Sequence, residues 1–146
     1  MPVKPVPDGF RTVTPCLVVK DAASLLPFLE KAFSAEIVQC NRTPDGTVMH
    51  AQARIGDSMV MLGEAMPKYG AIPAMLYLYV PDVDALHRRA VAAGGVSLAE
   101  PSDQFYGDRV GGVKDTHGNQ WWMATHKEDV PPEEVARRAA ASGKHC

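Results

Sequence analysis

Apolar and polar residues alternate over several short stretches of the chain, and two of these stretches begin the same order of signals. "TVTPCLVVKDAASLLPFLEKAFSAEIV" begins at Thr12 and "AMLYLYVPDVDALHRRAVAAGGVSL" begins at Ala74. Each predicts a strand rich in β-branched or aromatic residues, then an Asp that caps a helix, a helix, and a further strand. The expected helix caps are Asp21 and Asp82.

A second pair of matching stretches follows the first pair. "RIGDSMVML" from Arg54 and "DTHGNQWWMA" from Asp115 each place a tight glycine turn before an alternating strand. The offset between the turns nearly equals the offset between the caps, which indicates a duplicated βαβββ unit. We therefore predict an α+β fold in which two modules, at about residues 10–65 and 74–127, form curled mixed sheets around a cavity.

The helical patterns differ in clarity. Pro27 has no backbone N–H, so the first helix either begins near Ser24, with the proline in its first turn, or is kinked. The second helix has one apolar stripe, formed by Val83, Leu86, Ala90 and Ala93. The tail, residues 129–146, contains "DVPPEEVARRAAASG" and predicts a C-terminal surface helix. All of these elements are expected within a single domain, residues 1–146.

Alternation along the strands predicts two different faces. One face is uniformly apolar and is expected to pack against the helices; it includes Leu17, Met59, Met61, Leu76 and Trp121. The other face mixes aromatic residues with groups that form hydrogen bonds; it includes Cys16, His50, Val60, Leu62, Tyr77, Tyr79, Trp122 and His126. Apolar walls with a few polar groups are typical of small-molecule sites. Alternatively, these aromatic residues fill a second core or a subunit interface.

Composition narrows the possible partners. The chain has 146 residues, 46% of them hydrophobic and 22% charged, and a net charge of -2. It has no basic footprint for nucleic acid and no apolar stretch long enough for a membrane, so we expect a cytoplasmic protein. The three cysteines, Cys16, Cys40 and Cys146, form no closely spaced pair, which favours reduced thiols over disulfides or a cysteine zinc site.

Several motifs together resemble a known family. "TPCLVVKDAA", "HAQARIGDSMVML", "LYVPDVDAL" and "DTHGNQWWMATH" resemble the glyoxalase/bleomycin-resistance, or vicinal oxygen chelate, superfamily and its PhnB-like branch. The resemblance covers about residues 10–127 and implies a homodimer that binds a small molecule. The fold hosts lyases, isomerases, dioxygenases, thiol transferases and antibiotic binders, so it does not fix a function.

The same resemblance locates the family's metal ligands on the first and last strands of each half. In this chain those positions are Thr14, Val60, Met75 and Trp122. None is a good ligand for a divalent first-row metal, so we expect neither the standard metal site nor another cofactor. A divalent metal at a displaced site would need residues from different strands, namely Cys16, His50, Glu64 and His126.

The first functional hypothesis is a metal-free protein that binds or sequesters an aromatic or amphipathic compound such as an antibiotic. Its expected ligand-binding residues are His50, Tyr77, Tyr79, Phe105, Tyr106, Arg109 and Trp122. Within the loop "SDQFYGDR", Arg109 either clamps an anionic group of the ligand or pins the loop by pairing with an acid.

The second hypothesis is an enzyme, lyase, isomerase or dioxygenase-like, that acts next to a carbonyl through displaced metal ligands or acid/base residues. Its catalytic candidates are His50, Glu64, Asp108 and His126. A third hypothesis is an accessory subunit whose cavity is filled by its own side chains.

Overall fold

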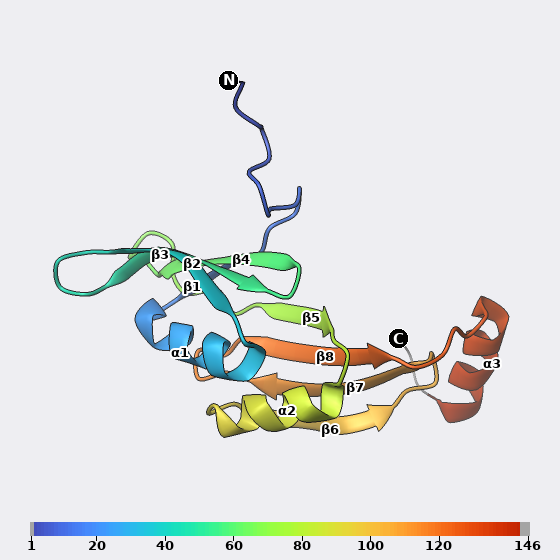
Figure 1. The fold of residues 1–146 in the computed structure, drawn as a ribbon. Helices are drawn as coiled ribbons and strands as arrows, with labels where there is room; N and C mark the ends of the chain where they lie inside the picture. The colour runs from blue at the N-terminus through green and yellow to red at the C-terminus, as the bar shows by residue number, and fades with distance from the viewer. Residues whose placement is uncertain (1, 144–146) are drawn as a thin grey trace.

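The computed structural model describes residues 2–143, which form two four-stranded sheets and three helices (Figure 1). The strand order in the first sheet is β1 (Cys16–Val19), β4 (Ser58–Glu64), β3 (Val48–Ile55) and β2 (Glu36–Arg42). The order in the second sheet is β5 (Met75–Tyr79), β8 (Gln120–His126), β7 (Asp108–Lys114) and β6 (Val96–Asp103). The helices are α1 (Ala22–Phe33), α2 (Val83–Ala92) and α3 (Pro132–Ser142).

The two halves of the chain repeat one topology. In each half the first and last strands pair in parallel, and the remaining neighbours pair antiparallel. The structure therefore confirms the predicted α+β fold of two βαβββ modules followed by a C-terminal helix. Residues 144–146 of the predicted tail, including Cys146, lie outside the described residues.

The N-terminus of α1 is capped by a residue far away in the sequence. Asp21 occupies the predicted N-cap position of α1, but its backbone is left-handed (φ 58°) and its side chain makes no capping hydrogen bond. Instead, the Glu64 carboxylate accepts the N–H groups of Asp21 (2.8 Å) and Ala22 (3.0 Å). The parallel pairing of β1 with β4 places Val19 opposite Glu64 and so brings this carboxylate to the helix end.

The N-terminus of α2 has a local cap and a distant one. Asp82 accepts the Ala85 N–H at 3.1 Å, which confirms the predicted cap. In addition, Oγ1 of Thr125 on β8 accepts the Val83 N–H at 2.9 Å. In both modules, the last strand therefore supplies an oxygen to the start of the helix.

The start of α1 also decides between the alternatives for Pro27. The helix begins at Ala22, so the proline lies inside it, beyond the first turn, rather than in the first turn of a helix that begins near Ser24. Pro27 is exposed.

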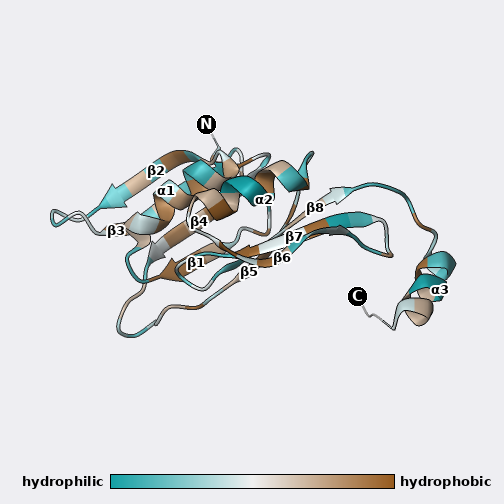
Figure 2. Ribbon diagram, turned by 90° about the horizontal axis from the view of Figure 1, so that it is seen from below, coloured by the Kyte–Doolittle hydropathy of each residue, from teal (hydrophilic) through white to brown (hydrophobic). Residues whose placement is uncertain are grey.

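The main core lies between the sheets and the helices α1 and α2. Trp121 is fully buried, and its ring packs against Phe33 with 4.8 Å between centroids. Apolar and hydrophilic residues are mixed along α1 and α2, as expected for helices that bury one face (Figure 2). By contrast, α3 stands apart from both sheets and buries none of its residues, in agreement with the predicted surface helix (Figure 1).

One strand face was predicted incorrectly. Met59 and Met61 were expected to face the helices, but Val60 and Leu62 belong to the core, and Leu62 lies beside Leu17 in the sheet. Both faces of β4 are apolar, so alternation gives no contrast by which to orient this strand. Its orientation is fixed by its pairing with β1.

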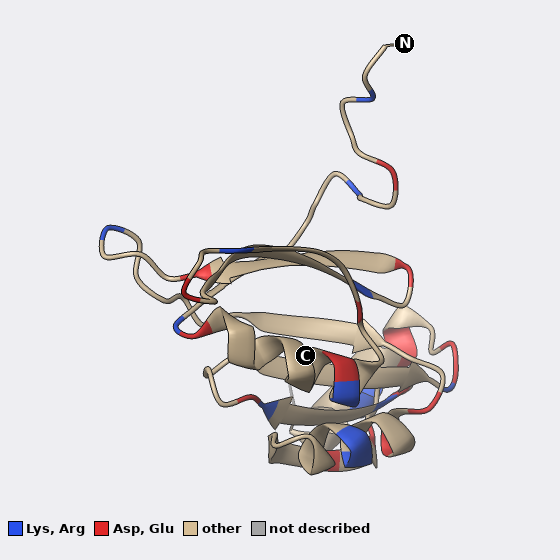
Figure 3. Ribbon diagram, turned by 60° about the vertical axis from the view of Figure 1, so that its left-hand side comes forward, with Lys and Arg blue, Asp and Glu red and all other residues tan. Residues whose placement is uncertain are grey.

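Charged residues are interspersed along the chain, with acidic and basic positions on loops, strands and helices (Figure 3). Within residues 2–143, no helix has the length and apolar character needed to cross a membrane.

Candidate ligand-binding site

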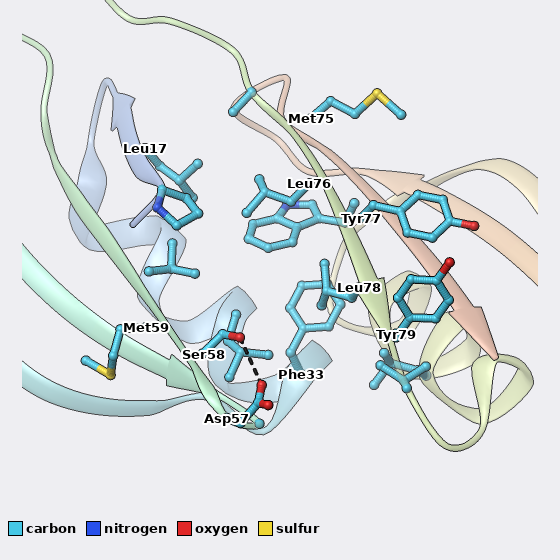
Figure 4. A pocket seen from close by; sticks show the side chains of 18 of the residues that line it. Leu17, Phe33, Asp57, Ser58, Met59, Met75, Leu76, Tyr77, Leu78 and Tyr79 are labelled. Atoms are coloured by element: carbon cyan, nitrogen blue, oxygen red, sulfur yellow. Dashed lines mark hydrogen bonds between the residues drawn. The ribbon is translucent and has the colours of Figure 1, made fainter. Parts of the chain in front are cut away.

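A cavity of about 1110 Å³ lies between the two modules (Figure 4). The first module contributes β1, the residues before it and the start of β4, and the second contributes β5 and the start of α2. Its main apolar lining residues are Leu17, Phe33, Met59, Leu76, Leu78 and Trp121. In the described part of the chain, no hydrogen-bonded strand pair joins the two sheets, so the cavity occupies the space between their edge strands β1 and β5.

Alternation along β5 separates two environments. The side chains of Leu76 and Leu78 lie toward Leu17 and Phe33, whereas the rings of Tyr77 and Tyr79 point to the opposite side of the strand (Figure 4). The open face is defined here as the face of the second sheet that carries these two tyrosines, away from the helices. The cavity and the open face therefore lie on opposite sides of β5.

Four charged residues also line the cavity, namely Arg11, Asp57, Asp82 and Arg89. Arg89 is already engaged, because its guanidinium donates to the Lys31 carbonyl (3.0 Å) and to Ser34 Oγ (2.7 Å) at the end of α1. The cavity thus combines a mainly apolar lining with a few polar groups, as small-molecule sites do.

The open face carries a hydrogen-bonded cluster around one buried carboxylate. Asp108 is only 4% exposed. Its Oδ2 accepts from the Tyr79 hydroxyl at 2.9 Å and from the Tyr77 hydroxyl at 3.5 Å, and its Oδ1 accepts from His126 Nδ1 at 2.7 Å. His126 Nε2 donates to Asp129 at 2.7 Å. This cluster brings together two of the four catalytic candidates, Asp108 and His126.

The cluster also changes the titration of its members. Hydrogen bonds to Asp108 and then Asp129 raise the pKa of His126, because both carboxylates favour the imidazolium. Burial, followed by a hydrogen bond with Tyr106, raises the pKa of Tyr77. The hydrogen bond to Asp108 raises the pKa of Tyr79. Near neutral pH both tyrosines are therefore neutral donors.

Trp122 lies on the same open face and packs over Gly112 of the neighbouring strand β7, which has no side chain. A Cβ atom at Gly112 would lie only 2.6 Å from Cε3 of the Trp122 ring, so the indole occupies the space above this glycine. The Trp122 Nε1–H donates to Gln120 at 3.0 Å. The Phe105 and Tyr106 rings pack edge to face, with 5.2 Å between centroids, in the turn before β7.

Arg109 points to the other side of β7, toward α2. Its guanidinium makes two bonds to Asp84, of 2.9 and 3.0 Å, and a third to Asp103 of 3.2 Å. The same interaction lowers the pKa of Asp84. Of the two alternatives for Arg109, the structure therefore favours a pin between α2, β7 and the end of β6 over a ligand clamp.

The other candidates are separated. His50 lies half-buried on β3 of the first sheet, whereas His126 lies on the second sheet, and Glu64 caps α1. Among residues 2–143, no three His, Cys, Asp or Glu side chains form a group suited to hold a metal ion. Of the predicted ligand-binding residues, only Tyr77 and Tyr79 line the cavity.

The side chains that form most of the cavity wall were not among the predicted ligand-binding residues. Leu76 and Trp121 were assigned only to packing against the helices, and Leu78 lies on the same face of β5 as Leu76. They line the cavity because the modules leave a gap between β1 and β5, and no local sequence pattern signals such a gap.

Comparisons with known proteins place these features in context. The model of the Glyoxalase/Bleomycin resistance protein/Dioxygenase superfamily matches residues 11–123. The uncharacterized protein Mb0911c of Mycobacterium bovis is 35% identical over 144 residues, which cover 90% of this chain and 93% of that protein. The uncharacterized protein Rv0887c of Mycobacterium tuberculosis is likewise 35% identical, over 90% of this chain and 84% of its own length.

Two solved structures show the same fold. TioX from Micromonospora sp. ML1 superposes with a TM-score of 0.69 and 24% identity, covering 80% of this chain and 98% of TioX. A PhnB protein from Bacillus cereus superposes with a TM-score of 0.63 and 21% identity, covering 79% of this chain and 99% of that protein. These findings confirm the family resemblance predicted from the motifs.

Proposed function

Since this chain belongs to the glyoxalase/bleomycin resistance protein/dioxygenase superfamily, we propose that it binds an apolar or aromatic small molecule in the cavity between its modules. The observation that carries this proposal is the cavity of about 1110 Å³ with its mainly apolar lining. Cavities of this kind favour ligands that lose apolar surface to solvent on binding. Binding or sequestration of a compound such as an antibiotic is one specific form of this function.

The open face supports a second proposal, contact between two copies of the chain. Met75, Tyr77 and Tyr79 are 65, 42 and 66% exposed, so apolar surface accumulates along β5. Two-fold homodimers are the commonest assembly, and a contiguous apolar patch is typical of an interface. We therefore propose a homodimer, which sedimentation at several protein concentrations would test.

An enzyme is the second candidate function, because of the cluster around Asp108. A buried carboxylate that orients His126, with the Tyr79 hydroxyl beside it, provides proton donors for acid/base chemistry next to a carbonyl. The superfamily's name includes glyoxalases and dioxygenases, so turnover of thiol adducts of 2-oxoaldehydes, with and without divalent metals, is the direct assay. A Tyr79→Phe variant that keeps full turnover would argue against this cluster.

Dye binding tests the first candidate. We expect 1-anilinonaphthalene-8-sulfonate to bind saturably and to fluoresce when it enters the cavity. Leu78→Trp places an indole in the cavity and should weaken dye binding by roughly tenfold or more, because close-packed interiors exclude a second occupant. Val96→Trp adds the same indole to an exposed position on β6 and is the matched control. Equal dye binding by both variants would refute binding in this cavity.

A further inference from the structure

One edge of β5 is open within the described chain. The strand pairs only with β8, and two backbone bonds fix which of its peptide groups point there. The Gln120 N–H donates to the Ala74 carbonyl, and the Val80 N–H donates to the Ala124 carbonyl, each at 2.8 Å. In a parallel ladder, alternate residues of a strand bond to the same neighbour, so the intervening peptide groups point away from β8. These outward groups belong to Met75, Tyr77 and Tyr79.

The open edge faces the cavity. All residues of β5 line the cavity, although the rings of Tyr77 and Tyr79 lie on the open face (Figure 4). Tyr77 and Tyr79 therefore contribute their backbone groups, and not their rings, to the cavity edge of β5. Within residues 2–143, no backbone or side-chain hydrogen bond engages the outward N–H and C=O groups of Met75, Tyr77 and Tyr79.

Unpaired peptide groups beside an apolar cavity define the chemistry of a complementary ligand. We propose that the ligand is an extended, peptide-like molecule that adds as one more strand along β5, an inference that rests on the proposed binding function. Residues of equal facing recur about every 6.8 Å along a strand, so the ligand needs amide groups at that spacing. Its backbone would satisfy the outward peptide groups, and its apolar side chains would contact the lining around Leu76 and Leu78.

The opposite wall favours a single extended chain over a strand of a second copy. That wall contains β1, whose Val18 carbonyl already accepts the Ile72 N–H at 3.0 Å. The Phe33 and Trp121 rings and the start of α2 also line the cavity. Because one protein chain provides lining residues on both sides, the space suits a narrow ligand better than the edge of another folded sheet.

Hydrogen exchange read at single residues tests the proposal, with the capped peptide acetyl-Lys-Val-Leu-Val-Leu-Val-Lys-amide as the probe. In the free protein, we expect the amides of Met75, Tyr77 and Tyr79 to exchange faster than those of Leu76 and Leu78, which bond to β8. The peptide should slow exchange of the three outward amides by about tenfold or more and leave the inward pair unchanged. Leu78→Trp should remove this protection, and Val96→Trp should retain it.

The control ligand is the same peptide with every backbone nitrogen methylated, which keeps the side chains and removes the N–H donors. If the methylated analogue binds as tightly as the parent peptide, strand addition is refuted. If the dye also binds, the cavity is still a binding site. If neither peptides nor dye bind, the proposed function fails as well. Protection of the outward amides without peptide, which fades on dilution, would show that a second copy occupies the edge and would also overturn the proposal.

Discussion

The buried Asp115 carboxylate supports the turn before β8, and its removal should be among the most destabilising single changes in the chain. Asp115 is 5% exposed and accepts four hydrogen bonds. The donors are the backbone N–H groups of His117 (2.8 Å) and Asn119 (3.0 Å), Asn119 Nδ2 (3.0 Å) and Trp121 Nε1 (2.9 Å). Asn119 and Trp121 are fully buried, so three of these four donors have little access to water.

Asp115→Ala leaves those three donors without an acceptor. Each unsatisfied buried donor costs about 1–3 kcal/mol, and partial rearrangement reduces the sum, so we expect a loss of about 4 kcal/mol in the free energy of unfolding. Urea unfolding followed by circular dichroism measures this loss. Asp57→Ala is the control, because Asp57 is exposed and, among residues 2–143, its side chain bonds only to Ser58.

Trp121→Phe provides a second test that does not depend on the Ala variant folding. This change removes one donor together with its bond and leaves Asp115 with the other three. We expect it to cost less than Asp115→Ala, about 1–2 kcal/mol, mainly through lost packing. A loss below about 1 kcal/mol for Asp115→Ala, or a larger loss for Trp121→Phe, would refute the hydrogen-bond argument.

Three further changes test other parts of the structure. Glu64→Ala should cost about 1–2 kcal/mol in urea unfolding because it removes the acceptor at the start of α1, and unchanged stability would contradict the capping role. Arg109→Ala should lower the melting temperature and leave dye affinity unchanged; the opposite pattern would indicate a ligand clamp. The folded-state pKa of His126 is raised above its usual 6.5, so its stabilising contribution is present below pH 6.5 and is lost as pH rises through the raised value. Melting temperatures between pH 6 and 9 should therefore fall less steeply for His126→Gln than for the native chain, and parallel curves would argue against this assignment.

The sequence predicted the second sheet better than the first for a physical reason. The two faces of β8 differ in polarity, so alternation correctly assigned Trp121 to the core and Trp122 to the open face. In β4 the run from Met59 to Leu62 is apolar on both faces, and only pairing with β1 orients it. Alternation predicts the orientation of a strand only where the two environments differ.

Long-range contacts account for the remaining differences. The role of Glu64 depends on contact with α1, and the partner of Arg109 is set by the packing of Asp84 on α2 against β7. The sequence shows which acidic residues could pair with a basic residue, but the tertiary structure decides which of them forms the ion pair. For the same reason, the cavity between β1 and β5 follows from the arrangement of the modules rather than from any local pattern.

The distant helix caps have a consequence for how the protein folds. Glu64 on β4 and Thr125 on β8 complete the starts of α1 and α2, although each lies more than 40 residues from the helix end that it caps. Neither helix gains this support until the last strand of its module has docked beside the first. Contacts between such distant residues slow folding because a long loop must close before they form. Each module should therefore fold as one cooperative unit, and its helix amides should acquire protection at the same time as those of its last strand.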